Sequence, residues 1–106
     1  MSEYKGEIAY DELQAHEVSF LTDFFKMLGD STRIHLLFLL MERDACVSDL
    51  ASQLGMTTSA ASHQLSLLKA NKLVKQRRSG KMIFYTLVDD HVRMVLETGT
   101  EYILLR

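Results

Sequence analysis

The sequence of 106 residues contains no proline and a single cysteine. Proline breaks helix interiors, so its absence suits a mainly helical chain. Because Cys46 stands alone, the chain cannot form an internal disulfide or hold zinc with a cysteine cluster. No apolar run approaches the ~18 residues of a membrane span, and the N-terminus is acidic and polar rather than signal-like. We therefore expect a cytoplasmic protein without a membrane partner.

Sequence motifs of common enzyme classes are missing as well. The chain has no glycine-rich phosphate-binding loop, no HExxH motif and no Ser/His/Asp arrangement at a favourable spacing. Cys46 has no evident general base, and the flanking Asp44 and Asp49 disfavour a reactive thiolate. We predict that the protein is not an enzyme and that Cys46 is a small buried apolar residue.

Acidic residues are absent from the middle of the chain. Between Leu50 and Val88 there is no Asp or Glu, while six Lys and Arg give this block a net charge of +6. Residues 1–49 carry a net charge of −6, and residues 89–106 carry −2. The whole-chain charge of −2 therefore hides a segregated positive block, which is the electrostatic footprint expected for binding a polyanion.

The first half of this basic block has the pattern of a helix-turn-helix. Ser48 is a candidate N-cap for a short helix over 49–54, and Gly55 suits the left-handed backbone at its end. A polar helix over 57–71 follows after a short turn. Two helices joined in this way predict a helix-turn-helix, in which the second helix enters the DNA major groove.

The helix predicted over 57–71 has two different faces. A period of 3.6 residues places Ala61, Leu65 and Leu68 on one side, where they can pack against a core. Short polar side chains gather on the other side and can approach base edges and phosphates closely. We predict this helix to be the recognition helix.

A β-hairpin is predicted directly after the recognition helix. The period changes to two, which predicts strands over 73–78 and 81–87 joined by Ser79-Gly80. This hairpin, over 73–87, has a basic tip and is placed as a wing that contacts phosphates or the minor groove. The predicted DNA-binding residues are Thr58, Ser59, Ser62, His63, Gln64, Ser66 and Lys69 from the helix and Arg77, Arg78 and Lys81 from the hairpin.

Two outer helices carry more apolar surface than one small domain covers. Amphipathic patterns predict helices over 10–28 and 89–105, and Gly99 in the second suggests close approach of another backbone. We expect these two helices to form a homodimer. Residues 1–9 are interpreted as a flexible lead-in, and residues 10–106 as a single winged helix-turn-helix domain.

The remaining helix is predicted over 32–41. Nearly all its residues are apolar, so we expect it to be the central buried helix, with His35 as a core histidine. Either Asp30 or Ser31 can cap it. The expected fold is therefore mainly α with a small β-hairpin, namely a winged helix-turn-helix with about five helices and a two-stranded wing.

Four segments together resemble the ArsR/SmtB family of bacterial winged-helix repressors. They are residues 28–33 (LGDSTR), 46–51 (CVSDLA), 59–65 (SAASHQL) and 80–85 (GKMIFY). The resemblance covers roughly residues 24–106. It implies a homodimer that represses an operon by binding a palindromic DNA operator and that leaves the operator when an effector binds, commonly a metal ion.

The resemblance also implies where a metal effector would bind. Asp89 and His91 match the first half of a family site that spans the paired C-terminal helices, whereas the second half falls on Tyr102 and Leu105. Leucine cannot coordinate, and tetrahedral zinc needs about four donors. Candidates for the missing donors are Glu101 of the partner subunit, Tyr102 of the partner subunit, Glu97 and His16. A second family site uses Cys-x-Cys, which is represented here by Cys46 and Ser48.

These observations predict a sequence-specific DNA-binding transcriptional repressor released by an effector, with Zn²⁺ or another divalent metal as the leading candidate. Two alternatives stay open. One is a winged-helix repressor without metal sensing that responds to a redox signal or a small molecule. The other is a winged-helix protein-interaction module that does not bind DNA.

Overall fold

The computed structural model describes residues 13–105, which form five helices and one hairpin. In chain order the elements are α1 (Ala15–Leu28), α2 (Ser31–Glu42), α3 (Val47–Leu54), α4 (Thr58–Ala70), β1 (Val74–Ser79), β2 (Met82–Leu87) and α5 (Asp90–Leu104). The predicted mainly helical fold with a small hairpin is confirmed. The lead-in predicted over residues 1–9 and the beginning of the helix predicted over 10–28 lie outside the described residues.

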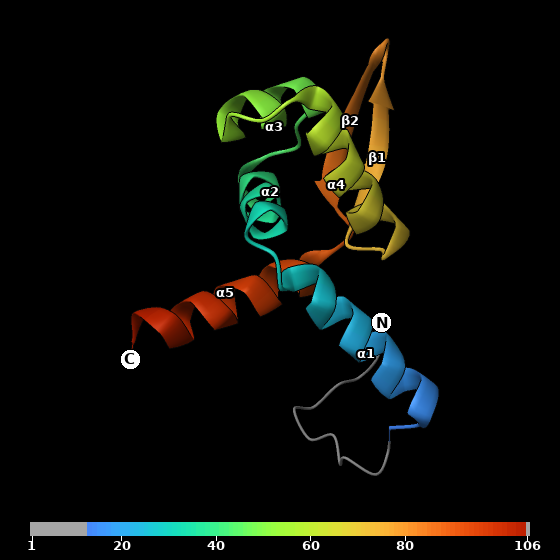
Figure 1. Cartoon of the computed structure of the whole chain (residues 1–106), viewed down its shortest axis with the longest axis vertical. Coiled ribbons are helices and arrows are strands. Elements are labelled where there is room, and N and C mark those ends of the chain that lie inside the picture. Colours follow the sequence, from blue (N-terminus) through green and yellow to red (C-terminus); the bar gives the residue numbers. More distant parts are fainter. Residues whose placement is uncertain (1–12, 106) are drawn as a thin grey trace.

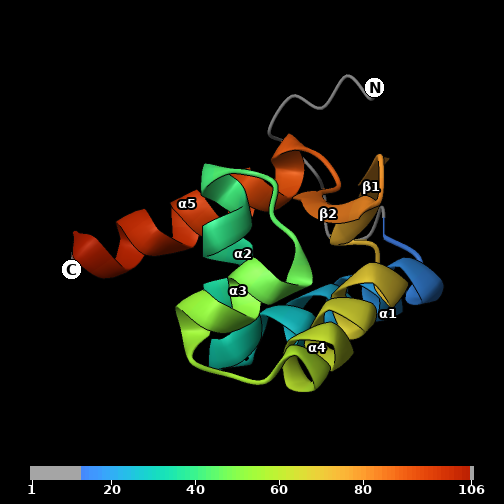
Figure 2. The same cartoon turned by 90° about the horizontal axis from the view of Figure 1, so that it is seen from above.

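The elements form a head with two helices extending from its underside (Figure 1). In the head, α4 packs against both α3 and the hairpin (Figure 1), and the view from above shows α3 and the hairpin beside it (Figure 2). Helix α2 lies beneath them, and α1 and α5 leave the underside in different directions. None of the helices within residues 13–105 is long and apolar enough to cross a membrane. The recognition helix and the wing therefore lie at the end opposite to the two outer helices.

The core is built around one side of α2. Leu36, Leu37 and Leu40 of this helix are buried, together with Leu65 and Leu68 of α4. The cluster is completed by residues of the α2–α3 connection, α3, the hairpin with the residue before it, and the first half of α5, namely Ala45, Leu50, Leu73, Val74, Tyr85, Leu87, Val92 and Leu96. Each fully buried Leu contributes roughly 1.5–3 kcal/mol relative to exposure. Packing against α2 thus fixes α4 and the hairpin as one unit.

The prediction for α2 is correct on that side only. His35 is exposed, and its Nδ1 lies 2.7 Å from the Ser31 carbonyl oxygen, so the expectation of a core histidine is wrong. Phe38 is also exposed, at 37%. At 100° per residue, both positions turn away from Leu36 and Leu40. The apolar sequence of α2 therefore did not distinguish its buried side from the side that is exposed in this chain.

Helix boundaries differ most from the predictions at α1 and α3. Within the described residues α1 begins at Ala15 and excludes Leu13 and Gln14, because the Gln14 backbone N–H donates to Glu17 Oε1 at 3.0 Å and closes the first turn. Helix α3 begins at Val47 with Cys46 as N-cap, so Ser48 is inside the helix. Of the two cap candidates for α2, Asp30 is the cap, since its carboxylate accepts the Arg33 backbone N–H at 3.0 Å.

The hairpin has a different turn from the predicted one. Ser79 pairs with Met82 at the end of an antiparallel ladder, so Gly80 and Lys81 form the turn rather than Ser79-Gly80. Gly80 has φ +62°, a conformation that glycine adopts without a steric penalty. At the other edge, Ala45 and Tyr85 exchange two backbone hydrogen bonds. The shifted turn places Lys81 at the extreme tip.

Candidate nucleic-acid interface

Helix α4 is held in the head by its cap and by one apolar side. The Thr57 hydroxyl accepts the Ala60 backbone N–H at 3.0 Å, which satisfies a free donor of the first turn. Ala61, Leu65 and Leu68 are fully buried, as the period of the sequence predicted. The orientation of the helix about its own axis is therefore fixed by burial of these three side chains.

The opposite side of α4 presents short polar groups. Thr58, Ser59, Ser62, His63 and Ser66 are all exposed. Ala60 and Ala70 are the exposed apolar residues of α4. The five polar residues and Val47 line a shallow hollow on this side of the helix. Hydroxyls donate and accept, and imidazole can do either, so the surface can hydrogen-bond to base edges and to phosphate oxygens.

Gln64, a predicted contact residue, lies outside this polar surface. It is half-buried, and its Oε1 accepts a hydrogen bond from Arg33 Nη1 at 3.2 Å. Two residues along a helix correspond to a rotation of about 200°, so Gln64 is turned well away from Ser62. Arg33 was not among the predicted site residues. The sequence shows only that Arg33 lies in the first turn of α2, three residues after the Asp30 cap, and gives no sign of its hydrogen bond to Gln64.

Lys69 connects the recognition helix to the wing. Its Nζ donates to Gln76 Oε1 at 2.9 Å, and Gln76 Nε2 donates to the Tyr85 hydroxyl oxygen at 2.9 Å. Gln76 and Tyr85 are paired across the hairpin. The predicted DNA contact at Lys69 is therefore already engaged in a bond that holds the hairpin against the end of α4.

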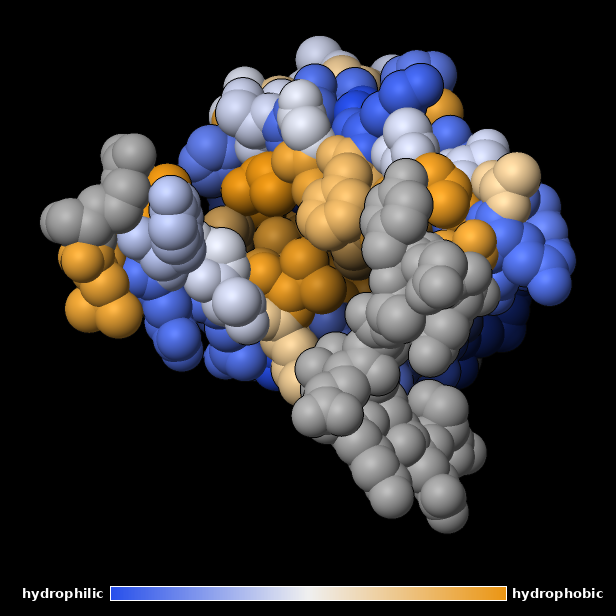
Figure 3. Space-filling view, turned by 90° about the horizontal axis from the view of Figure 1, so that it is seen from below, coloured by the Kyte–Doolittle hydropathy of each residue, from blue (hydrophilic) through white to orange (hydrophobic). Residues whose placement is uncertain are grey.

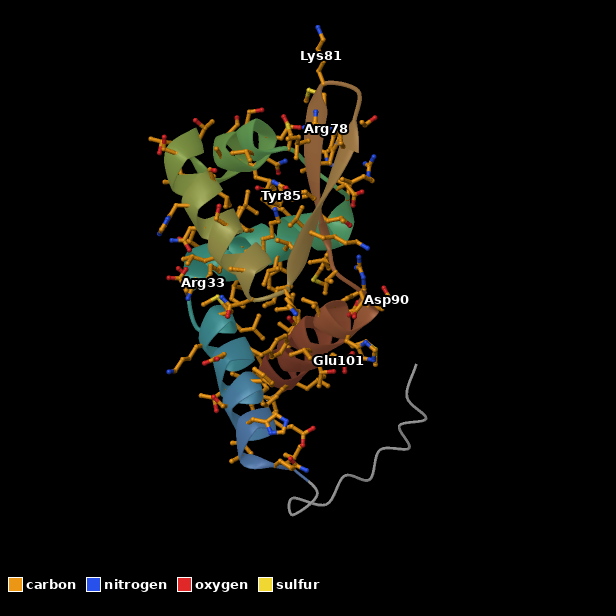
Figure 4. All side chains as sticks on the ribbon, turned by 90° about the vertical axis from the view of Figure 1, so that its right-hand side faces the viewer. Arg33, Arg78, Lys81, Tyr85, Asp90 and Glu101 are labelled. Carbon is orange, nitrogen blue, oxygen red and sulfur yellow. The ribbon has the colours of Figure 1, made fainter. Side chains whose placement is uncertain are left out.

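The two hairpin arginines differ in their surroundings. Arg77 Nε lies 3.2 Å from Asp44 Oδ2, and the guanidinium stacks over Phe84 at 4.9 Å from the ring centroid. Arg78 and Lys81 are exposed, and their side chains form no hydrogen bond or ion pair within residues 13–105. Both extend from the far end of the hairpin (Figure 4). Side chains alternate along a strand, so Arg78 shares the face of Gln76 and Tyr85, which is turned toward α4.

The charge distribution favours an anionic partner for this surface. Helix α4 and both strands contain no acidic residue, and Asp44 is the acid that reaches the hairpin. We define the nucleic-acid face as the exposed polar residues of α4 (Thr58, Ser59, Ser62, His63 and Ser66) together with Arg78 and Lys81. This face combines hydrogen-bonding groups on a rigid helix with free cations at its flank.

The predicted metal ligands are only partly brought together. Asp89 Oδ1 lies 3.5 Å from His91 Nδ1, and the same oxygen accepts the His91 backbone N–H at 2.9 Å as the cap of α5. Glu101 lies ten residues beyond His91, or about 15 Å along the helix axis, so it cannot join this pair within one chain. Within residues 13–105 no group of three His, Cys, Asp or Glu side chains could hold a metal ion.

Cys46 is buried, as predicted. Its Sγ lies 3.3 Å from the Ser48 hydroxyl oxygen, so the two positions of the family's Cys-x-Cys pattern are adjacent in space. Only one of them supplies a thiol.

A second surface is formed by α1, α2 and α5 on the underside. An open apolar groove runs between these helices and is lined by Phe25, Leu28, Ile34, Phe38, Val95, Leu96, Gly99, Thr100, Ile103 and Leu104. Figure 3 shows this apolar hollow from below. A methyl group added at Gly99 would meet no atom of another element within 4 Å, so no other described element approaches this glycine closely.

Comparison with known proteins identifies relatives that are named as transcriptional regulators. A family model described as "Bacterial regulatory protein, arsR family" matches residues 30–76. A transcriptional repressor SmtB homolog from Synechocystis is 42% identical over 72 residues, covering 68% of this chain and 54% of the relative. A cadmium resistance transcriptional regulatory protein CadC homolog from Staphylococcus aureus is 40% identical over 74 residues, covering 69% of this chain and 61% of the relative.

A solved structure covers almost the whole chain. The AntR antimony-specific transcriptional repressor is 33% identical, with a TM-score of 0.77, and the match covers 97% of this chain and 94% of that one. The chain spans less than two thirds of the SmtB and CadC homologs. The segment matched by the family model includes the recognition helix and the beginning of the wing. By its sequence and its fold, the chain belongs to the ArsR family of bacterial regulatory proteins.

Proposed function

We propose that the protein is a homodimeric, sequence-specific DNA-binding transcriptional repressor. The observation that carries the proposal is the nucleic-acid face, on which short polar side chains of α4 stand beside two free cations of the hairpin, with no acid on either element. Helix α4 would read bases in the major groove, and Arg78 and Lys81 would contact phosphates. The names of the SmtB homolog and AntR support a repressor.

The apolar groove supports the dimer. Phe25 is 54% exposed, Ile103 56% and Leu104 76%, which is a large apolar surface for a free chain. A second copy related by twofold symmetry would cover this groove and leave both α4 helices free on the opposite end of the assembly. Two reading helices about 34 Å apart would then match successive major grooves.

The dimer can be tested separately from DNA binding. Ile103→Lys places a charge in the groove and should shift sedimentation toward the monomer, because burying an unpaired ammonium is strongly unfavourable. Thr98→Lys is the matched control, since Thr98 is exposed on α5 and does not line the groove. Equal sedimentation of the two variants would contradict the proposed interface.

DNA binding is tested with duplexes selected by the protein from a random-sequence library. Affinity for the selected duplex should fall steeply with salt, because neutralised phosphates release counterions. The double variant Ser62→Ala, His63→Ala should lose specific binding and remain folded, because both side chains are exposed. Thr98→Ala serves as the control. A flat salt response would instead favour a protein-interaction module, the alternative that does not use DNA.

We also propose a metal ion as the class of effector. The names of two relatives refer to cadmium resistance and to antimony. The donors on this chain do not complete the family's zinc site, since Asp89 and His91 form a pair while Leu105 has no donor atom. Further donors would have to come from a second copy, and Glu101 of the partner subunit is the candidate.

A panel of metal ions tests this part of the proposal. At least one ion should lower the affinity for the selected duplex in the parent protein. His91→Ala reports whether the Asp89–His91 pair takes part, since a response that survives this substitution must arise elsewhere. If no ion changes the affinity, a redox signal or a small molecule becomes the effector class to examine, and the buried Cys46 is the only thiol available for it.

A further inference from the structure

Arg33 links three helices through one guanidinium group. Its Nε donates to the Met27 carbonyl oxygen at 2.9 Å, its Nη2 to the Lys26 carbonyl oxygen at 3.2 Å, and its Nη1 to Gln64 Oε1 at 3.2 Å. Lys26 and Met27 belong to the last turn of α1, and Gln64 belongs to α4. Within residues 13–105, no other side chain hydrogen-bonds to both α1 and α4.

The donor-only chemistry of the arginine side chain determines which atoms can face it in this link. A guanidinium donates in a fixed planar fork and never accepts, so the atom of Gln64 that faces it must be the carboxamide oxygen. The last carbonyl groups of a helix lack intrahelical donors and carry the negative end of the helix dipole, which favours a nearby cation. One rigid group therefore fixes both the end of α1 and a side chain on the recognition helix.

Few other contacts define the angle of α1. Among the residues that the structure describes, no side chain of α1 is fully buried, and only Phe24, Met27 and Leu28 pack against the core cluster. Of its other large apolar residues, Phe20 and Phe25 are more than half exposed, and Val18 and Leu21 are 37% and 46% exposed. The direction in which α1 leaves the head thus depends strongly on its C-terminal end, where Arg33 binds.

We infer that Arg33, through Gln64, is a positioning residue that sets the angle between α1 and α4 and thereby the spacing of the two half-sites that the dimer accepts. The inference rests on the proposed function and deepens it. Helix α1 has 14 residues and so a length of about 21 Å. A tilt of about 10° over that length displaces its far end by roughly 3.6 Å, close to the rise of one base pair.

The test breaks the link on the α4 side and keeps the bonds of Arg33 to α1. Gln64→Met removes the acceptor at nearly constant size. Gln53→Met is the matched control, because the Gln53 side chain is exposed on α3 and forms no hydrogen bond among the described residues. Each variant is measured on three probes, namely the duplex selected by the parent, the same duplex with one half-site scrambled, and versions with the spacer changed by one base pair.

We expect Gln64→Met to lower the affinity for the intact duplex by roughly tenfold, the effect of losing one charge-assisted hydrogen bond. Binding to the single half-site should change by less than twofold, and the preference for the parent spacing should weaken. Gln64→Glu restores an acceptor for Arg33, so it should recover the spacing preference although its added charge weakens binding to all duplexes. Gln53→Met should resemble the parent on every probe.

Two results would overturn the inference. If the loss on the intact duplex is only the product of two equal half-site losses, Gln64 acts by touching DNA in each half-site or by supporting the fold of each subunit. If Gln64→Met leaves the spacing preference unchanged, Arg33 does not set the angle. A parent protein that selects no duplex at all contradicts the proposed function itself, and the inference fails with it.

Discussion

Removal of the Arg78 side chain should reduce the salt dependence of DNA binding, whereas removal of the Arg77–Asp44 pair should not. Arg78 is exposed, has no partner within residues 13–105 and shares the face of the hairpin that is turned toward α4. Arg77 is paired with Asp44 at 3.2 Å and stacked on Phe84. Only a cation that is free in the unbound protein adds fully to phosphate neutralisation.

The size of the effect follows from counterion release. Each phosphate contact contributes about 0.9 to the slope of log affinity against log salt, so Arg78→Ala should reduce the slope by about 1.8 in a dimer. Between 50 and 200 mM salt, a slope difference of about 1.8 changes the affinity ratio of parent to variant by roughly twelvefold. The deficit of the variant is therefore largest at low salt and shrinks as salt is added.

The assay is fluorescence anisotropy on the selected duplex across this salt range. The double variant Asp44→Ala, Arg77→Ala is the control, because it removes one positive and one negative group and leaves the net charge unchanged. Its slope should equal that of the parent. An Arg78→Ala slope equal to the parent value would refute the reasoning, and so would a control slope reduced as much as that of Arg78→Ala, since Arg77 would then leave Asp44 to bind phosphate.

Three stability predictions can be checked by urea unfolding at one fixed protein concentration. Leu65→Ala should lower the free energy of unfolding by about 2–5 kcal/mol, because Leu65 is fully buried beneath the recognition helix. Gly55→Ala should lower it by about 1–2 kcal/mol, since φ is +62° and the added methyl group meets no other atom, so the loss is backbone strain alone. Asp30→Ala should lower it by about 1 kcal/mol through loss of the α2 cap, and a change below about 0.3 kcal/mol would contradict that role.

The arrangement of elements was predictable because local rules determine it. The burial of Ala61, Leu65 and Leu68 follows from a 3.6-residue period, and the hairpin follows from a period of two. Boundaries were less predictable, since residue type alone does not determine which residue caps a helix. Ser48 is the better N-cap by residue type, yet Cys46 holds that position and Ser48 lies in the first turn.

The partners of individual side chains were not predictable, because they are distant in the sequence. Arg77 and Arg78 are neighbours of identical type, and only the position of Asp44, 33 residues away from Arg77, distinguishes them. Gln64 is a predicted contact residue, and its hydrogen bond to Arg33, 31 residues away, has no signal in the sequence around either residue. His35 was misplaced for a related reason, since the apolar sequence around it gave no sign that one side of α2 is open.

Formal charge therefore overestimates the electrostatic contribution of the basic block. Of its six cations, Lys69 is bonded to Gln76 and Arg77 to Asp44. The side chains of Lys72, Lys75, Arg78 and Lys81 form no hydrogen bond or ion pair within residues 13–105, which leaves at most eight free cations from this block in a dimer. At about 0.9 per phosphate contact, these eight cations limit the contribution of the block to the slope of log affinity against log salt to roughly 7. All twelve cations of the block in a dimer would contribute roughly 11. A measured contribution near the higher value would require Lys69 and Arg77 to exchange their protein partners for phosphates, and the hairpin would then have to move away from α4 when DNA binds.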